Sequence, residues 1–206
     1  MTHIEHGEKM LVMRIFISVL VLIFSLQSLT KADDINEFEI EGMSIGDSAL
    51  DFFSKEEIKN FKIVEYPSSK RIIGWESPAS MKFKKYIAIT FHVKSNDKNY
   101  EILSIKGMLD MENKKKECLD KKKKIVDEIK SFLNLKEDYS YEANFGNKAG
   151  KSIAYITDFD LESGSIRIWC TVWDKKNETS KNWIDTLNVS VGSEYFFDFL
   201  NNEAYK

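Results

Sequence analysis

The clearest pattern of hydrophobic and polar positions lies in Asn113–Leu133, where apolar side chains recur at helical spacing. Cys118, Ile125, Ile129 and Phe132 fall on one side of this segment. Lysines and acidic residues occupy the other side, where they lie three or four positions apart. The spacing predicts one long helix with an apolar stripe that faces a core and a solvated, charged outer face.

Alternation with a period of two predicts strands on both sides of this helix. In Tyr86–Val93, Ile89 and Phe91 point one way while Thr90 and His92 point the other. Tyr100–Leu109 returns as the next strand after a polar turn. The other predicted strands are Ile63–Tyr66, Arg71–Trp75, Ser152–Leu161, Ser165–Trp173 and Trp183–Val191.

Serines mark the expected starts of the shorter helices. Ser54 and Glu57 form the pattern of a capping box, and Ser193 precedes a short terminal helix. Ser44 and Asp47 fit the same S-x-x-[DE] pattern, which predicts a further helix start and a loss of stability in Ser44→Ala.

The order of these elements predicts an α+β fold. Antiparallel strands, in one sheet or several, are expected to pack against one long helix, with short helices near both ends. The connections are too short for parallel crossovers, which need a dozen or more residues. Each half reads loosely as a helix followed by strands, although no repeat is visible residue by residue.

The N-terminal segment predicts export. Lys9 and Arg14 precede an apolar run that is too short to span a bilayer, and small residues follow up to Ala32. This pattern predicts a secretory signal peptide at residues 1–32 and a single domain at residues 33–206, which is periplasmic or extracellular. Translation starts at Met1, Met10 or Met13 are all compatible with this signal. A retained N-terminal anchor is the alternative, but we expect no integral membrane protein after cleavage.

Charge and length narrow the classes of function. Residues 33–206 carry 27 basic and 31 acidic residues, a net charge near -4. This balance argues against binding to nucleic acid, which favours a basic surface. No linker rich in Pro, Gly or Ser divides the chain, which is long enough for one core.

The two cysteines are expected to form a disulfide. Cys118 lies on the apolar stripe of the long helix, and Cys170 shares a strand face with Ile166 and Ile168. A helix packed on a sheet brings these faces together, and an oxidising compartment favours the bond. A redox-active pair, the alternative, normally has C-x-x-C spacing, which is absent.

Two hydrolase patterns overlap in the segment Glu41–Leu50, EGMSIGDSAL. Ser44 lies in a G-x-S-x-G pattern and Ser48 in a block that resembles the GDSL esterases. That family also needs D-x-x-H near its C-terminus, which this chain lacks, and His92 is the single histidine of residues 33–206. We therefore expect no catalytic residues, and a serine esterase using His92 remains the alternative.

Neither a metal nor a cofactor is predicted. One histidine and two separated cysteines give no zinc spacing, and the acidic segment Asp158–Gly164 departs from a calcium loop at two positions. The candidate binding surface is the strand face of Arg167, Trp169 and Trp173, because tryptophan and arginine are frequent at recognition sites. The alternative is that another layer of the domain covers this face.

Four segments carry a resemblance to a family of small exported proteins from marine alphaproteobacteria that has no assigned activity. They are Phe38–Ile58, Cys118–Leu133, Phe159–Cys170 and Asn182–Val191. The resemblance implies a periplasmic α+β protein and transfers no catalytic residue. The Gly42-Met43-Ser44 segment is also similar to the start of small outer-membrane assembly lipoproteins, which bind other proteins, but this chain lacks their lipid-bearing cysteine.

The sequence therefore favours an exported, non-enzymatic module that binds a protein or an envelope component. The alternatives are a secreted GDSL-like esterase and a protein that binds a small ligand or carbohydrate. The ligand or partner itself is not specified by any motif.

Overall fold

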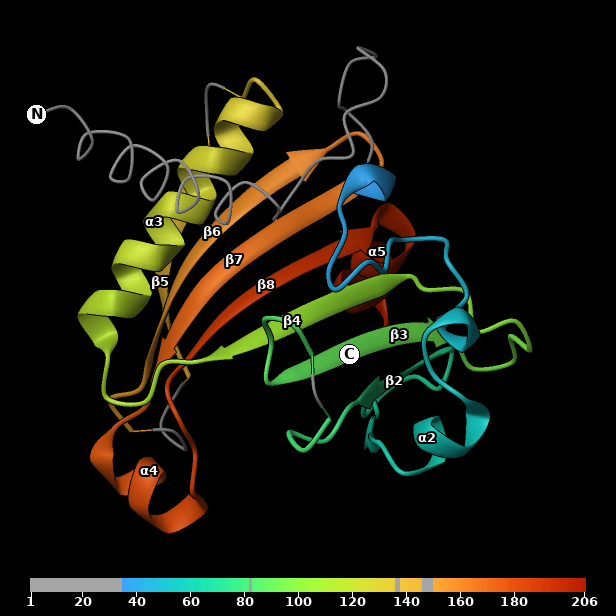
Figure 1. Cartoon of the computed structure of the whole chain (residues 1–206), viewed down its shortest axis with the longest axis horizontal. Coiled ribbons are helices and arrows are strands. Elements are labelled where there is room, and N and C mark those ends of the chain that lie inside the picture. Colours follow the sequence, from blue (N-terminus) through green and yellow to red (C-terminus); the bar gives the residue numbers. More distant parts are fainter. Residues whose placement is uncertain (1–34, 82, 136–137, 146–149) are drawn as a thin grey trace, which may run out of the picture. The chain divides into compact units, whose positions relative to one another are not determined.

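An antiparallel sheet of eight strands organises the described part of the chain (Figure 1). The computed structural model describes residues 35–81, 83–135, 138–145 and 150–206. The strands are β1 (Lys62–Val64), β2 (Ile72–Glu76), β3 (Ala88–Lys94), β4 (Ser104–Asp110), β5 (Tyr139–Asn144), β6 (Ile153–Leu161), β7 (Gly164–Val172) and β8 (Thr186–Ser193). Their order across the sheet is β1-β2-β3-β4-β8-β7-β6-β5, and all neighbouring pairs are antiparallel.

The sheet is built from two consecutive meanders. Strands β1 to β4 follow one another in space as in sequence, and so do β5 to β8, while β4 and β8 pair at the centre. A helix precedes each meander: α2 (Lys55–Lys59) the first and α3 (Lys115–Phe132) the second. The remaining helices are α4 (Lys175–Lys181) and α5 (Glu194–Asn202), with 3-10 turns at η2 (Ile35–Glu37) and η3 (Ala49–Asp51). The predicted α+β fold with one long helix is confirmed.

Helix α3 packs on β7 and β8 through its apolar stripe, to which Cys118, Val126 and Ile129 contribute buried side chains. A disulfide joins Cys118 to Cys170 of β7, with 6.0 Å between the two Cα atoms. The predicted helix-to-strand disulfide is thereby confirmed. Among the described residues there is no free cysteine.

Two hydrophobic clusters lie on opposite faces of the sheet. The larger lies beneath α3 and includes alternate residues of the central strands, such as Phe91, Ile105 and Ile168. The smaller joins α5 to the other face, where Phe196 lies 4.7 Å from His92 between ring centroids. Its buried members are Tyr66, Ile72, Leu103, Phe196, Phe199 and Ala204. Helix α5 thus covers one end of the face that α3 leaves open.

The N-terminal region differs from the sequence prediction at Ser44. Residues 44–47 form turns, so no helix begins there. The backbone N–H of Ser44 instead donates to the Asp47 carboxylate at 2.8 Å. The pattern S-x-x-D describes this turn as well as a helix start, because the same short-range bond closes both. Ser48 caps η3, and the predicted capping box of Ser54 and Glu57 at α2 is confirmed.

Strand β5 and helix α4 were not predicted. Strand β5 has the polar sequence YSYEAN and lies at the edge of the sheet, where no apolar face is required. Helix α4 is capped by Asp174 and contains no apolar residue, so it has no apolar stripe to predict it. The predicted signal segment, residues 1–32, lies outside the described residues.

Candidate binding face of the sheet

The candidate residues Arg167 and Trp169 lie on the sheet face opposite α3. Their neighbours in β7, Ile166, Ile168 and Cys170, are fully buried on the α3 side. Because successive strand residues point to opposite faces, Arg167 and Trp169 project from the other side. Trp169 is partly exposed, and the Arg167 side chain is 38% exposed. The described part of the chain therefore leaves this part of the face accessible.

Strand register brings a row of polar residues across this face. Arg167 of β7 lies opposite Ser190 of β8, and Ser190 lies opposite Lys106 of β4. The row continues on both sides into the outer strands. From β5 to β1 it reads Tyr139, Asp158, Arg167, Ser190, Lys106, Thr90, Glu76 and Lys62.

Arg167 is held by a bidentate ion pair on this row. Its Nε and Nη2 atoms donate to the two carboxylate oxygens of Asp158 at 2.7 and 2.9 Å. The Tyr141 hydroxyl also donates to this carboxylate at 3.2 Å. Two parallel bonds fix the plane of the guanidinium group, so Arg167 is oriented before any ligand arrives.

Lys106 is the second cation of the row and is less completely paired. Its ammonium group lies 3.5 Å from Glu76, which also receives bonds from Lys62 and Thr90 at 3.2 Å. Burial lowers the pKa of Lys106, although the Glu76 carboxylate acts in the opposite direction. The Lys106 side chain is 23% exposed, so the cation is partly desolvated with one long contact.

A second row lies beside the first and supplies apolar surface. Trp169 lies opposite Ile156 of β6 on one side and Asn188 of β8 on the other. Met108 of β4 and Tyr141 of β5 extend this row, and both are partly exposed. Aromatic and methionine side chains next to fixed charges are typical of protein recognition surfaces. The sequence did not indicate Lys106, Ser190 or Met108, because only the register of β4 and β8 places them here.

Trp173, the third candidate residue, belongs to a different group of side chains. It stands one residue beyond β7 and packs against Phe145 and Trp183, with ring centroids 4.8 and 4.3 Å apart. Phe145 is 43% exposed and Trp183 is 37% exposed. We call these three residues the end cluster. Lys181 lies beside the end cluster, with its ammonium group 4.0 Å from the centroid of the Trp183 ring.

The residues of the esterase alternative are not assembled. His92 is buried beneath α5, and neither ring nitrogen has a hydrogen-bond partner among the described residues. Ser48 donates its hydroxyl proton to the Asn99 carbonyl, and Ser44 lies in the turn described above. Burial lowers the pKa of His92 to about 3, with Lys106 acting in the same direction. In this arrangement neither the Ser44 nor the Ser48 hydroxyl is bonded to His92 or to another basic side chain of the described residues.

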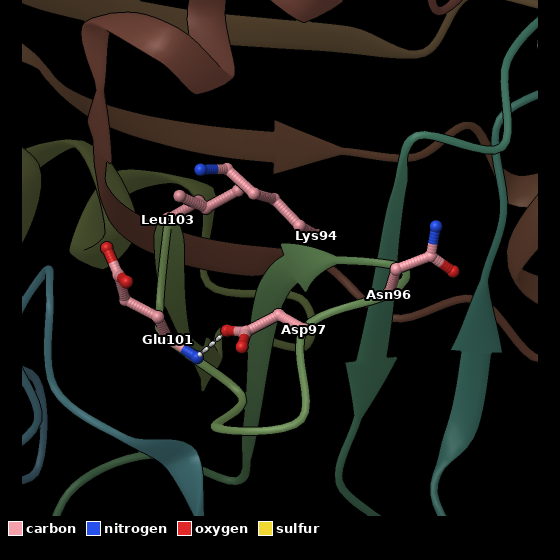
Figure 2. A pocket seen from close by; sticks show the side chains of 5 residues that line it. All are labelled: Lys94, Asn96, Asp97, Glu101 and Leu103. Carbon is pink, nitrogen blue, oxygen red and sulfur yellow. Dashed lines mark hydrogen bonds between the residues drawn. The ribbon is translucent and has the colours of Figure 1, made fainter.

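A separate cavity of about 330 Å³ lies at the β3–β4 turn (Figure 2). Four of its five lining residues are charged or polar, and Leu103 is the apolar one. Figure 2 shows the Asp97 carboxylate bonded to the backbone N–H of Glu101, so this carboxylate serves the turn itself. The lining residues are Lys94, Asn96, Asp97, Glu101 and Leu103. Small-molecule sites are usually lined by apolar groups, so this cavity is a weaker candidate than the sheet face.

The described residues contain no cluster of His, Cys, Asp or Glu arranged to hold a metal ion. None of the helices in the described ranges is long and apolar enough to cross a membrane. No protein-family model matches this sequence, and neither a curated protein nor a solved structure shows significant similarity to it. The resemblance to small exported proteins therefore stays a prediction from the sequence.

Proposed function

We propose that the protein is an exported, non-catalytic module that binds a protein or an envelope component through the open face of its sheet. The main support is the accessible pair of rows around Arg167, Trp169 and Lys106, which combines oriented charges with aromatic surface on a rigid sheet. The buried disulfide is consistent with an oxidising compartment and so supports export.

Paired tryptophan variants test this proposal. Wild-type protein, Trp169→Ala and Trp183→Ala are each immobilised and exposed to the same envelope extract. A partner that binds the sheet face is expected to be captured by wild type and by Trp183→Ala, and lost with Trp169→Ala. Loss of capture in Trp183→Ala but not in Trp169→Ala contradicts binding through the sheet face. Thermal unfolding of both variants shows whether each retains the fold, and Trp169→Phe is expected to restore capture if the aromatic ring is required.

The end cluster favours a second candidate function, the binding of carbohydrate. Exposed aromatic rings can stack on sugar rings, and Lys181 supplies a nearby cation. Tryptophan fluorescence during titration with envelope polysaccharide tests it. A saturating change that Trp183→Ala abolishes and Trp169→Ala retains supports this candidate, and a change that persists in Trp183→Ala contradicts it.

The esterase alternative has a direct test of its own. A fluorophosphonate probe reacts with activated serines, and we expect no labelling of Ser44 or Ser48, because neither has a base beside it. Labelling at either serine, lost in its alanine variant, contradicts a non-catalytic module.

Export is tested by the N-terminus of the secreted protein. Cleavage after Ala32 predicts that the mature chain begins at Asp33, which N-terminal sequencing measures directly. A mature chain that retains residues 1–32 supports the anchored alternative instead.

A further inference from the structure

Three side chains at the centre of the open face form a group of hydrogen-bond donors. Lys106, Ser190 and Arg167 occupy directly opposite positions on the adjacent strands β4, β8 and β7. Neighbouring strands are about 4.8 Å apart, so the three Cα atoms span roughly 10 Å in a line. We call these residues the central patch.

The central patch has more donors than acceptors. Lys106 has a single ion-pair contact, to Glu76 at 3.5 Å, and an ammonium group offers three donors. Arg167 uses Nε and Nη2 on Asp158, and its Nη1 donates to no residue in the described ranges. The Ser190 hydroxyl likewise bonds to no other described side chain. Several donors therefore remain for an acceptor that approaches from outside the sheet.

The strand register places the two cations of the patch inside their carboxylate partners. Arg167 and Lys106 lie on either side of Ser190, and their carboxylate partners Asp158 and Glu76 lie further out along the row. The ion pairs with these carboxylates use Nε and Nη2 of Arg167 and one contact of the Lys106 ammonium group, so Nη1 of Arg167 and further donors of Lys106 remain. An anion above Ser190 would complete the coordination of the partly desolvated Lys106.

The apolar row beside the patch indicates what carries the anion. Trp169 and Met108 lie two residues along the strands from Arg167 and Lys106, on the same face. The cavity of Figure 2 is lined by other residues, so a small anion bound at the central patch would lie outside that cavity. A protein segment, in contrast, can contact Trp169 and Met108 and exclude water from the charges.

We propose that the central patch receives a carboxylate side chain from an acidic segment of a partner protein. This inference rests on the proposed function, because it assigns the chemistry of the partner to the same sheet face. It makes Lys106 the residue that selects for negative charge and Trp169 the residue that contacts the rest of the segment.

Binding of a labelled decaglutamate peptide tests the proposal at low ionic strength by fluorescence anisotropy. Wild-type protein is expected to bind decaglutamate and not decaglutamine. Lys106→Gln is expected to weaken binding roughly tenfold, as the loss of one charge-assisted hydrogen bond implies. Lys123→Gln is the matched control, because Lys123 lies on α3, carries the same charge and pairs with Asp127. It is expected to leave the affinity within a factor of about two, because exposed charges elsewhere are screened.

A second variant separates a loss of binding from a loss of the folded structure. Arg167→Gln alone would leave the Asp158 carboxylate without its main partner, whereas Asp158→Asn/Arg167→Gln replaces both charges together. The double variant is expected to unfold at a temperature close to wild type and to lose peptide affinity as Lys106→Gln does.

Several outcomes overturn the proposal. Equal weakening by Lys106→Gln and Lys123→Gln would indicate general electrostatic attraction, and absence of decaglutamate binding would remove the site. Displacement by millimolar inorganic sulfate would identify a small-anion site. Binding to phosphatidylglycerol vesicles with the same dependence on Lys106 would identify a lipid surface. A partner that is lost with Trp169→Ala but retained by Lys106→Gln would leave the proposed function standing and contradict only the acidic segment.

Discussion

His92 is the buried polar side chain whose replacement tests the packing of the sheet most directly. Its ring lies between Phe196 and Tyr66, with centroids 4.7 and 5.9 Å away. The backbone of Gly74 closes the remaining side, since a Cβ atom there would lie 2.5 Å from His92 Cδ2. Leucine has nearly the volume of histidine and no polar atoms, so His92→Leu fits this space better than a larger ring.

Two effects determine the size of the change. At pH 7, removal of ring nitrogens that lack partners is expected to raise the free energy of unfolding by about 1–3 kcal/mol, less any repacking cost. The second effect depends on pH. Burial lowers the pKa of His92 to about 3, with a contribution from Lys106 and an opposing one from Glu76, whereas an unfolded histidine titrates near 6.5.

The sign of the pH effect follows from proton uptake. Between pH 6.5 and 3 the unfolded chain binds a proton at His92 that the folded chain does not bind, so stability falls as the pH falls. The loss approaches about 1.4 kcal/mol per unit, or about 2 kcal/mol between pH 7 and pH 5. His92→Leu removes this contribution while all carboxylates still titrate.

Urea unfolding of wild type and His92→Leu at pH 7, 6 and 5 measures both effects. The difference in stability is expected to favour the variant at pH 7 and to grow by about 2 kcal/mol at pH 5. His92→Met serves as a second apolar variant with a more adaptable shape. A difference that stays constant with pH would refute the buried, neutral state of His92. A variant that is less stable at every pH would show that the ring nitrogens are satisfied in the folded protein.

Two further predictions concern stability. Replacement of both Cys118 and Cys170 by alanine is expected to lower the free energy of unfolding by about 4 kcal/mol, since the bond closes a loop with a sequence separation of 52. Urea unfolding midpoints with and without reductant measure this loss. Reductant is expected to lower the midpoint of wild type and to have no effect on the variant. Asp47→Ala is expected to cost about 1 kcal/mol because its carboxylate accepts the Ser44 N–H, whereas Ser44→Ala, which keeps that N–H, is expected to be nearly neutral. Equal losses in these two variants, measured by thermal unfolding, would restore the cap predicted for Ser44.

Local patterns were sufficient for much of this fold. The stripe of Asn113–Leu133 predicted α3 within a few residues, and the faces of Cys118 and Cys170 predicted their disulfide. Strand β5 could not be found in this way, because an edge strand needs no apolar face and owes its place to pairing with β6. The turn at Ser44 was misread because one short hydrogen bond serves both a helix start and a turn.

The sequence predicted only part of the candidate site, because the rest depends on which strands pair. Arg167 and Trp169 share a strand face, which alternation reveals directly. Lys106 and Ser190 join them through the pairing of β4 with β8, and no local pattern specifies that register. The burial of His92 likewise depends on Phe196, which lies far along the chain.

The two-meander topology also determines at which stage of folding the chain is most prone to aggregate. Each meander is made of local hairpins, whereas paired residues of β4 and β8 lie about 80 positions apart, which makes their pairing slow. The disulfide joins α3 to β7, so it can form within the second meander before β4 pairs with β8. Until then β4 and β8 each present an open edge that can pair with another chain. We therefore expect aggregation during folding to depend on this last pairing step, in which β4 and β8 cover each other's edges.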